Sequence, residues 1–248
     1  MNIIVSGWPG VGSSTNAKLL SYIFNLRYIY VGGIVKFLAQ KMGYNSKTKE
    51  FIIWSEKYLN DWDYIWENFI LEEYKNFENT VIDAKLLGFF INEKVVKKIF
   101  IIASRQARMK RFASDKRKIL LNQRDKILEL DWKKRYNIDF FDLNFIKQHY
   151  DFILDTSNLN ITKAGIRVCE YIKGKKLDQN EIQKIQYIGD KFFKIPGILD
   201  TQLEKINLII PGYDIIKIIA TKYKKLLGLK INKELKDAIF EIANEKFS

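Results

Sequence analysis

Cysteine, histidine and proline are scarce in this 248-residue chain, which has one, one and three of them. A single cysteine excludes an intramolecular disulfide, and one cysteine with one histidine cannot form a Cys/His zinc site. The few prolines and 13 glycines argue against a loop-built or fibrous protein. Because Cys169 follows the apolar run 165–168, we expect a buried, unreactive thiol.

Long apolar runs are also missing. None reaches the roughly 18–20 residues that a membrane span needs, so we expect no membrane partner. Residues 1–7 (MNIIVSG) lack the basic region of a secretion signal, and a cytoplasmic location is therefore expected.

Apolar and basic residues are plentiful. The hydrophobic fraction is 47% and the aromatic fraction 14%, enough for a core, so wholesale disorder is excluded. The net charge of +13 attracts anions such as nucleotides, nucleic acid or acidic lipid. Lysine greatly outnumbers arginine, which an AT-rich coding sequence also explains, so basicity alone names no partner.

Five short apolar segments, rich in β-branched residues, predict five strands separated by helical stretches. This alternation indicates an α/β fold, a parallel sheet covered on both faces. The segments are residues 2–6, 27–31, 80–83, 95–103 and 152–157.

A glycine loop follows the first strand. Residues 7–14 (GWPGVGSS) fit the phosphate-loop spacing G-x-x-x-x-G-K-[ST] at every fixed position but one. Such glycines let successive backbone N–H groups form a nest that binds polyphosphate at a helix N-terminus. Ser14 is the hydroxyl expected on Mg²⁺. At position 13, Ser13 replaces the lysine that neutralises charge during phosphoryl transfer.

Arginine is concentrated in one segment. Six of the eight arginines lie between Arg105 and Arg135, and lysine is used elsewhere. Arginine is preferred where planar, bidentate phosphate contacts are needed, although a merely solvated helix pair is the alternative.

Two further regions are helical in pattern. Residues 46–77 carry Trp54, Trp62 and Trp66 at helical spacing, which favours core packing. Residues 174–248, the C-terminal extension, contain an amphipathic stretch over 214–229. That stretch favours docking on the main domain over contact with a membrane surface.

Several blocks in order resemble the nucleoside monophosphate kinases, most closely the archaeal-type cytidylate kinases. The resemblance covers about residues 1–172. It is carried by the glycine loop, residues 31–39 (VGGIVKFLA), 81–88 (VIDAKLLG), the arginine-rich segment ending in 136–143 (YNIDFFDL), and 150–157 (YDFILDTS).

The resemblance implies a fold and an activity. The fold is a P-loop NTPase three-layer sandwich: a parallel five-stranded sheet, an arginine-rich helical lid at about 105–136 and a helical extension. The kinase-like domain is 1–173, and 174–248 is an extension of unknown role. The activity is transfer of the γ-phosphoryl group of ATP to CMP or dCMP with Mg²⁺, by a monomer or homodimer.

The resemblance also implies site residues. Catalysis would use Asp83 and the lid arginines Arg108, Arg111 and Arg124. The acceptor would contact Gly33, Lys36 and Lys85. Asp83 as a helix cap and Lys36 as a solvated residue are the alternatives. The loop residues implied to bind ATP and, at Ser14, the metal are Gly7, Gly10, Val11, Gly12, Ser13, Ser14 and Thr15.

The chain departs from the family pattern at several charged positions. Lys36 and Lys85 stand where the family has arginine, so charge is kept but the bidentate fork is lost. Asp115 and Asp131 occupy two lid arginine positions in an ungapped alignment, and Arg117 or Arg135 compensates only if the register shifts.

Three function classes follow. The favoured one is the kinase, with activity impaired by Ser13. The second is a degenerate homologue that binds nucleotide or a partner with little or no turnover. The third is a nucleic-acid-binding module, which we do not expect because no RNA-binding motif is present.

Overall fold

A computed structural model of the protein describes residues 1–45, 50–92, 95–111, 115–192, 203, 205, 208–210, 212–222 and 231–245. The chain divides into two compact units. The first unit contains residues 1–28 and 79–209, and the second unit contains residues 29–78 and 210–248.

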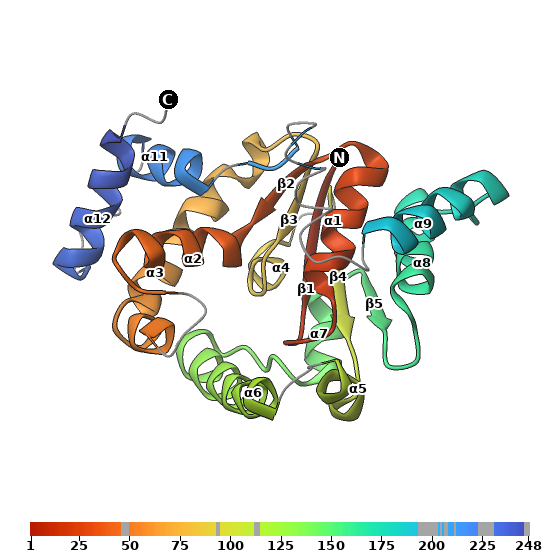
Figure 1. The fold of residues 1–248 in the computed structure, drawn as a ribbon, viewed down its shortest axis with the longest axis horizontal. Coiled ribbons are helices and arrows are strands. Elements are labelled where there is room, and N and C mark those ends of the chain that lie inside the picture. Colours follow the sequence, from red (N-terminus) through yellow and green to blue (C-terminus); the bar gives the residue numbers. More distant parts are fainter. Residues whose placement is uncertain are drawn as a thin grey trace. The chain divides into compact units, whose positions relative to one another are not determined.

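The five predicted strands are confirmed, and they form one sheet (Figure 1). The strands are β1 (Asn2–Gly7), β2 (Arg27–Tyr30), β3 (Thr80–Asp83), β4 (Val96–Ile102) and β5 (Phe152–Asp155), in the order β2-β3-β1-β4-β5. β1 pairs in parallel with β3 and β4, and β4 with β5. β1 is central and almost wholly buried, which explains its unbroken β-branched sequence.

Helices pack around this sheet in the first unit. They are α1 (Ser13–Phe24), α4 (Leu87–Phe90), α5 (Arg105–Lys110), α6 (Asp115–Tyr136), α7 (Leu143–His149), α8 (Ile161–Lys173) and α9 (Gln179–Phe192). α1 contacts β1, β3 and α8, and α4 contacts β1 and α7. The architecture is therefore the predicted α/β arrangement, and the arginine-rich segment is helical, as expected for the lid.

An aromatic cluster fills one part of the first unit. Phe89, Phe100, Phe140 and Tyr150 are buried together, with ring centroids 4.8–6.1 Å apart in tilted or edge-on pairs. Such geometry favours the ring quadrupoles as well as burying apolar area. The cluster connects β4 to the segments that follow α6 and precede β5.

The second unit is helical. It contains α2 (Val31–Lys41), α3 (Glu50–Glu73), the 3₁₀ turn Tyr74–Asn76, α11 (Gly212–Lys222) and α12 (Lys233–Asn244). Trp54, Trp62 and Trp66 of α3 are at most 5% exposed, which confirms that the aromatic stripe is core. No helix in the described ranges is long and apolar enough to span a bilayer.

The C-terminal extension contributes to both units. α9 packs on α8 in the first unit, whereas α11 and α12 pack on each other and on α2 in the second. Ile215, Ile216 and Ile219 of α11 are fully buried, so the amphipathic stretch docks on the protein as expected. The part of this stretch after residue 222 lies outside the described residues. The domain boundary at residue 173 stays a prediction.

Candidate active site

The glycine loop (residues 7–14) connects the carboxyl end of β1 to the first turn of α1. Gly10 and Gly12 have φ angles of 81° and 89°, a region in which only glycine is unstrained. A Cβ atom on Gly7 would lie 2.6 Å from the carbonyl oxygen of Ile101 on the neighbouring strand. The three glycines are therefore required by the backbone path and by a close approach between strands.

Two arginines, Arg108 of α5 and Arg111 directly after it, hold the carbonyl groups of the glycine loop. Arg108 Nη1 donates to the Pro9 carbonyl at 3.2 Å. Arg111 Nη1 donates to the carbonyls of Gly10 and Val11 at 3.3 and 3.1 Å. Three consecutive carbonyls thus accept hydrogen bonds from guanidinium groups that follow β4.

This fastening orients the loop amides. All described peptide bonds are trans, and across a trans peptide the C=O and the following N–H point in opposite directions. Carbonyls directed at Arg108 and Arg111 therefore direct the N–H groups of Gly10, Val11 and Gly12 away from them. Val11 N–H closes a turn onto the Trp8 carbonyl at 3.4 Å. The amides of Gly10 and Gly12 therefore point away from the two guanidinium groups, and successive N–H groups of this kind form anion-binding nests.

Thr156 completes the attachment from the end of β5. Its hydroxyl donates to the Val11 carbonyl at 3.2 Å, and Arg111 Nη2 donates to the Thr156 carbonyl at 2.6 Å. Sequence reasoning missed this role of Thr156, although the residue falls in the last block of the family resemblance. The loop is consequently held by residues from two other parts of the sequence.

Arg108 is nearly buried and also forms an ion pair. It is 5% exposed, and its two terminal nitrogens contact both carboxylate oxygens of Asp125 at 3.0 and 2.8 Å. Its guanidinium also lies 5.8 Å from the ring of Trp8. Asp125 was not predicted, because it lies on α6, 17 residues after Arg108 of α5, and no local sequence pattern marks such a pair.

Asp83, at the carboxyl end of β3, lies beside the hydroxyl of the glycine loop. Its carboxylate accepts a hydrogen bond from Tyr28 at 3.0 Å, and Ser14 is near enough to act on its pKa. β3 is the direct neighbour of β1, which brings this acid to the first turn of α1. A serine hydroxyl beside a buried carboxylate offers only oxygen ligands, the set that Mg²⁺ prefers, so these residues fit a magnesium–nucleotide complex.

Positive charges surround Asp83. Burial raises its pKa, while hydrogen bonds from Ser14 and Tyr28 and the charges of Lys18 and Lys85 act in the opposite direction. Lys18 is a cation that sequence reasoning missed. It follows Ser14 by four residues on α1, a spacing that places both on one helix face. Lys18 thus brings a positive charge near Asp83, in a site where Ser13 replaces the usual lysine.

Lys85 lies on a backbone segment that is fixed to the core. The Ser6 hydroxyl donates to the Ala84 carbonyl at 2.5 Å, and the Tyr150 hydroxyl donates to Ser6 at 2.9 Å. The Lys85 ammonium lies 6.0 Å from the ring of Trp132. A chain of hydrogen bonds from Tyr150, which directly follows α7, through Ser6 of β1 therefore positions the main chain at Ala84, next to Lys85.

The remaining predicted residues are placed as follows. Ser13 and Thr15 lie in the first turn of α1 with Ser14. Arg124 lies on α6, and its side chain is outside the described residues, as are those of Asp115, Arg117 and Asp131. The first unit therefore brings together the glycine loop, Asp83, Lys85, Arg108 and Arg111. The role of the two arginines at the transferring group stays a prediction, since both hold loop carbonyls here.

Gly33 and Lys36 belong to α2 in the second unit. A Cβ atom on Gly33 would lie 2.6 Å from the Tyr30 ring, so the close approach of that ring requires glycine. Lys36 Nζ donates to the Tyr30 hydroxyl at 3.5 Å and lies 5.7 Å from the ring centroid.

The sheet order and the glycine loop together define an α/β protein with a P-loop after its central strand. No protein-family model matches the chain. It is 29% identical over 176 residues to a protein named cytidylate kinase from Pyrobaculum islandicum, with 68% of this chain and 91% of the relative covered. A cytidylate kinase from Sulfolobus acidocaldarius is 29% identical over 168 residues, covering 64% and 87%.

A third relative agrees with these two. The cytidylate kinase from Methanocaldococcus jannaschii is 27% identical over 170 residues, covering 65% of this chain and 91% of the relative. Among solved structures, a shikimate kinase from Bacteroides thetaiotaomicron is 17% identical, with a TM-score of 0.45 and coverage of 70% and 98%. The similarity to archaeal cytidylate kinases supports a nucleoside monophosphate kinase, and about a third of this chain lies outside each match.

Proposed function

We propose that this protein transfers the γ-phosphoryl group of ATP to CMP or dCMP. The single observation that carries the proposal is the position of the buried Asp83, which ends the strand next to β1 and lies near Ser14 in the first turn of α1. A P-loop hydroxyl next to an acid at the end of the neighbouring strand is the arrangement that holds Mg²⁺ in P-loop phosphotransferases. The names of the relatives supply the acceptor class.

The reaction exchanges one phosphorus–oxygen bond for another. The bond between the γ-phosphorus and the oxygen bridging to ADP breaks, and a bond to a phosphate oxygen of the monophosphate forms. The products are ADP and CDP or dCDP. No covalent enzyme intermediate is needed, so the protein contributes positioning and electrostatic stabilisation.

The chain's residues divide this work. The amides of the glycine loop and the first turn of α1, including Ser13 and Thr15, hold the ATP phosphates. Ser14 and Asp83 would hold Mg²⁺, which neutralises phosphate charge when bound. Lys18 and Lys85 supply further positive charge near Asp83.

The residues for the acceptor are those that the family resemblance implies. Lys36 and Lys85 are the cations that we propose for its phosphate. Gly33 allows the backbone of α2 to lie against the Tyr30 ring. Arg124 and the terminal nitrogens of Arg108 and Arg111 are the lid groups that we propose stabilise the transferring phosphoryl group. We also propose that the protein is cytoplasmic and that it acts as a monomer or a homodimer.

A second function is favoured by Ser13. Without the loop lysine the protein would bind nucleotide and support little or no turnover, acting through the bound state. We propose that this serine reduces turnover but does not abolish it, because Lys18 and Lys85 place positive charge near Asp83.

The test is a coupled assay of ADP release with ATP and Mg²⁺, using CMP, dCMP, UMP and AMP as acceptors and chromatography to identify the diphosphate. We expect one pyrimidine nucleotide to be phosphorylated and chelation of Mg²⁺ to stop the reaction. Absence of any diphosphate with every acceptor would contradict the proposal. ATP binding in that case would favour the second function.

A pair of aspartate variants shows whether the site itself is responsible. Asp83→Asn removes the charge beside Ser14, and we expect turnover to fall about 100-fold or more. Asp142→Asn is the matched control, because Asp142 caps α7 by accepting from Phe145 N–H at 2.7 Å. Equal effects of the two substitutions would assign the loss to folding.

A further inference from the structure

Four polar contacts attach the C-terminal helices of the second unit to α2 and α3. Lys41 Nζ contacts Glu245 at 2.5 Å, and Lys57 Nζ contacts Glu234 at 2.8 Å. Asp61 accepts from the Asn232 N–H at 2.7 Å, and Lys222 Nζ contacts Glu73 at 2.5 Å. These contacts reach the last turn of α2 and are distributed from the middle to the end of α3.

Apolar packing accompanies the polar contacts. α12 buries Leu235, Ile239 and Ile242, and both α11 and α12 contact α2. At the start of α11, a Cβ atom on Gly212 would lie 3.5 Å from Cα of Ile34, in the first turn of α2. α2 is therefore touched by the extension near both of its ends.

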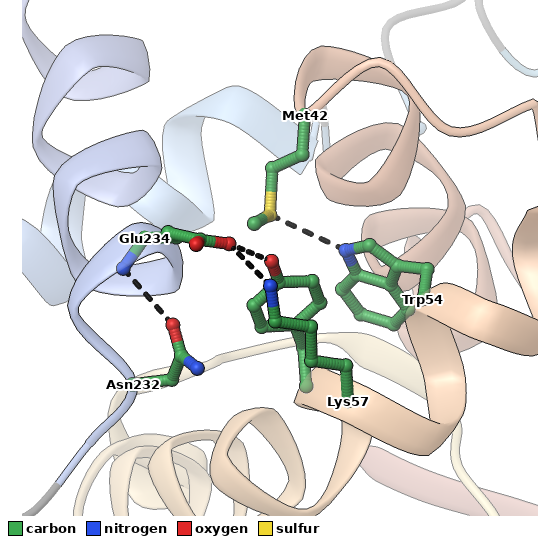
Figure 2. A network of polar contacts seen from close by, with 6 residues as sticks. Met42, Trp54, Lys57, Asn232 and Glu234 are labelled. Atoms are coloured by element: carbon green, nitrogen blue, oxygen red, sulfur yellow. Dashed lines mark hydrogen bonds and ion pairs between the residues drawn. The ribbon is translucent and has the colours of Figure 1, made fainter.

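Several polar contacts meet where α12 begins (Figure 2). Asn232 caps α12 by accepting from Glu234 N–H at 2.9 Å. The Glu234 carboxylate accepts from Lys57 and from the Tyr58 hydroxyl, and these hydrogen bonds lower its pKa. Burial, with a smaller effect from Glu234, raises the pKa of Tyr58 to about 12, so Tyr58 stays a donor at neutral pH.

The same junction reaches the end of α2. Trp54 Nε1, one turn before Tyr58 on α3, donates to Met42 Sδ at 3.3 Å, and Met42 directly follows α2 (Figure 2). Three elements from distant parts of the sequence thus share one polar junction. Because α2 carries Gly33 and Lys36, whatever fixes α2 also fixes these two residues.

We propose that α11 and α12 form a brace that positions α2 for the acceptor monophosphate. The proposal rests on the proposed function. Glu234, Glu245 and Asp61 are positioning residues of the brace, since they act through α2 and α3 rather than on substrate. Loosening the brace raises the KM for the monophosphate and leaves the KM for ATP unchanged, because the glycine loop is held within the first unit.

The test compares the native chain with Asp61→Ala/Glu234→Gln/Glu245→Gln. Exposed ion pairs are individually weak, so the three changes together are expected to raise the KM for CMP about tenfold. The KM for ATP and kcat should stay within about twofold. Glu241→Gln is the matched control, because it removes one charge from the same helix at an exposed residue.

A charge exchange separates positioning from general damage. Lys41→Glu alone should raise the KM for CMP, and Lys41→Glu/Glu245→Lys should restore most of it. Equal changes in both KM values, or no rescue, would overturn the brace.

Amide hydrogen exchange supplies a readout that does not depend on turnover. We expect faster exchange over residues 34–42 in the triple variant and native exchange in β1 and α1. A native chain that neither phosphorylates nor binds CMP would overturn the proposed function, and the assignment of α2 to an acceptor would fall with it. Native turnover with unchanged kinetics and exchange in the variants would overturn the brace alone.

Discussion

The glycine loop and helix α2 are each held by contacts from other elements, but different side chains make those contacts. Arginine fastens the loop: Arg111 alone donates to four oxygens, from Gly10, Val11 and Thr156. Lysine fastens the second unit, and each ammonium of Lys41, Lys57 and Lys222 meets one carboxylate. The side chains of Arg108 and Asp125 are 6% and 19% exposed, against 34% for both Lys41 and Glu245.

This difference follows from the two side chains. A guanidinium has five donors in a planar fork and can hold several fixed carbonyls at once, whereas an ammonium is a mobile point charge. Exposed single pairs contribute about 0–1 kcal/mol, while a buried bidentate pair is costly to break. We infer that the loop is held rigidly and that α2 is held by many weak contacts, which suits the acceptor-binding role proposed for α2.

The largest expected effect comes from removing the partner of Arg108. Asp125→Ala leaves a nearly buried guanidinium without its carboxylate, and the free energy of unfolding should fall by about 3 kcal/mol. Urea denaturation measures this. The control is Asp139→Ala, which breaks the pair of Lys133 and Asp139 at 50% and 42% exposure and should cost under about 1 kcal/mol. Similar losses for the two would refute the distinction.

Two glycines with nearly the same positive φ angle allow the function of the glycine loop to be tested separately from stability. Gly12 and Gly43 have φ angles of 89° and 85°. Replacing either with alanine should lower the free energy of unfolding by about 1–2 kcal/mol. Only Gly12→Ala should also weaken ATP binding, measured by calorimetry. Weaker ATP binding in Gly43→Ala would argue against a localised nucleotide site.

The arginine fork itself can be tested by conservative substitution. Arg111→Lys keeps the charge, but one ammonium cannot reach all four oxygens. We expect the KM for ATP to rise about fivefold, as for the loss of one to two hydrogen bonds. Arg105→Lys is the control, since Arg105 contacts only the Asn122 side chain among the described contacts, at 2.9 Å. An unchanged KM in Arg111→Lys would show that charge alone suffices.

The smallest effect is expected at Cys169, which lies on α8 in the first unit. The thiol is 1% exposed, and burial raises its pKa to about 12, so thiolate is negligible at pH 8. Alkylation by iodoacetamide should therefore be very slow in the native chain. It should be equally slow in the brace variants, because these loosen only the second unit. Faster alkylation there would show that the brace also stabilises the first unit.

Local patterns predicted the strands and the glycine loop, because runs of β-branched residues indicate strands and the glycine spacing of residues 7–14 indicates a phosphate loop. Asp83 was found at the end of β3, and its contact with Ser14 follows from the pairing of β3 with β1. Asp125 and Thr156 were missed, because their partners are 17 and 45 residues away and only folding brings them together.

The brace was equally hidden from the sequence. Its lysine and glutamate pairs span 149 to 204 residues along the chain. Amphipathic patterning predicted that the segment from residue 214 docks, but apolar periodicity does not encode which helix is the partner. The covered face of α2 became evident only from the packing of α11 and α12.

The most direct test of the account is the kcat of the native chain with ATP, Mg²⁺ and CMP, beside that of Ser13→Lys. Native turnover that rises at least about tenfold in Ser13→Lys is predicted, because the new ammonium adds charge at the transferring phosphate. Diphosphate absent from both proteins would contradict a kinase built on this loop.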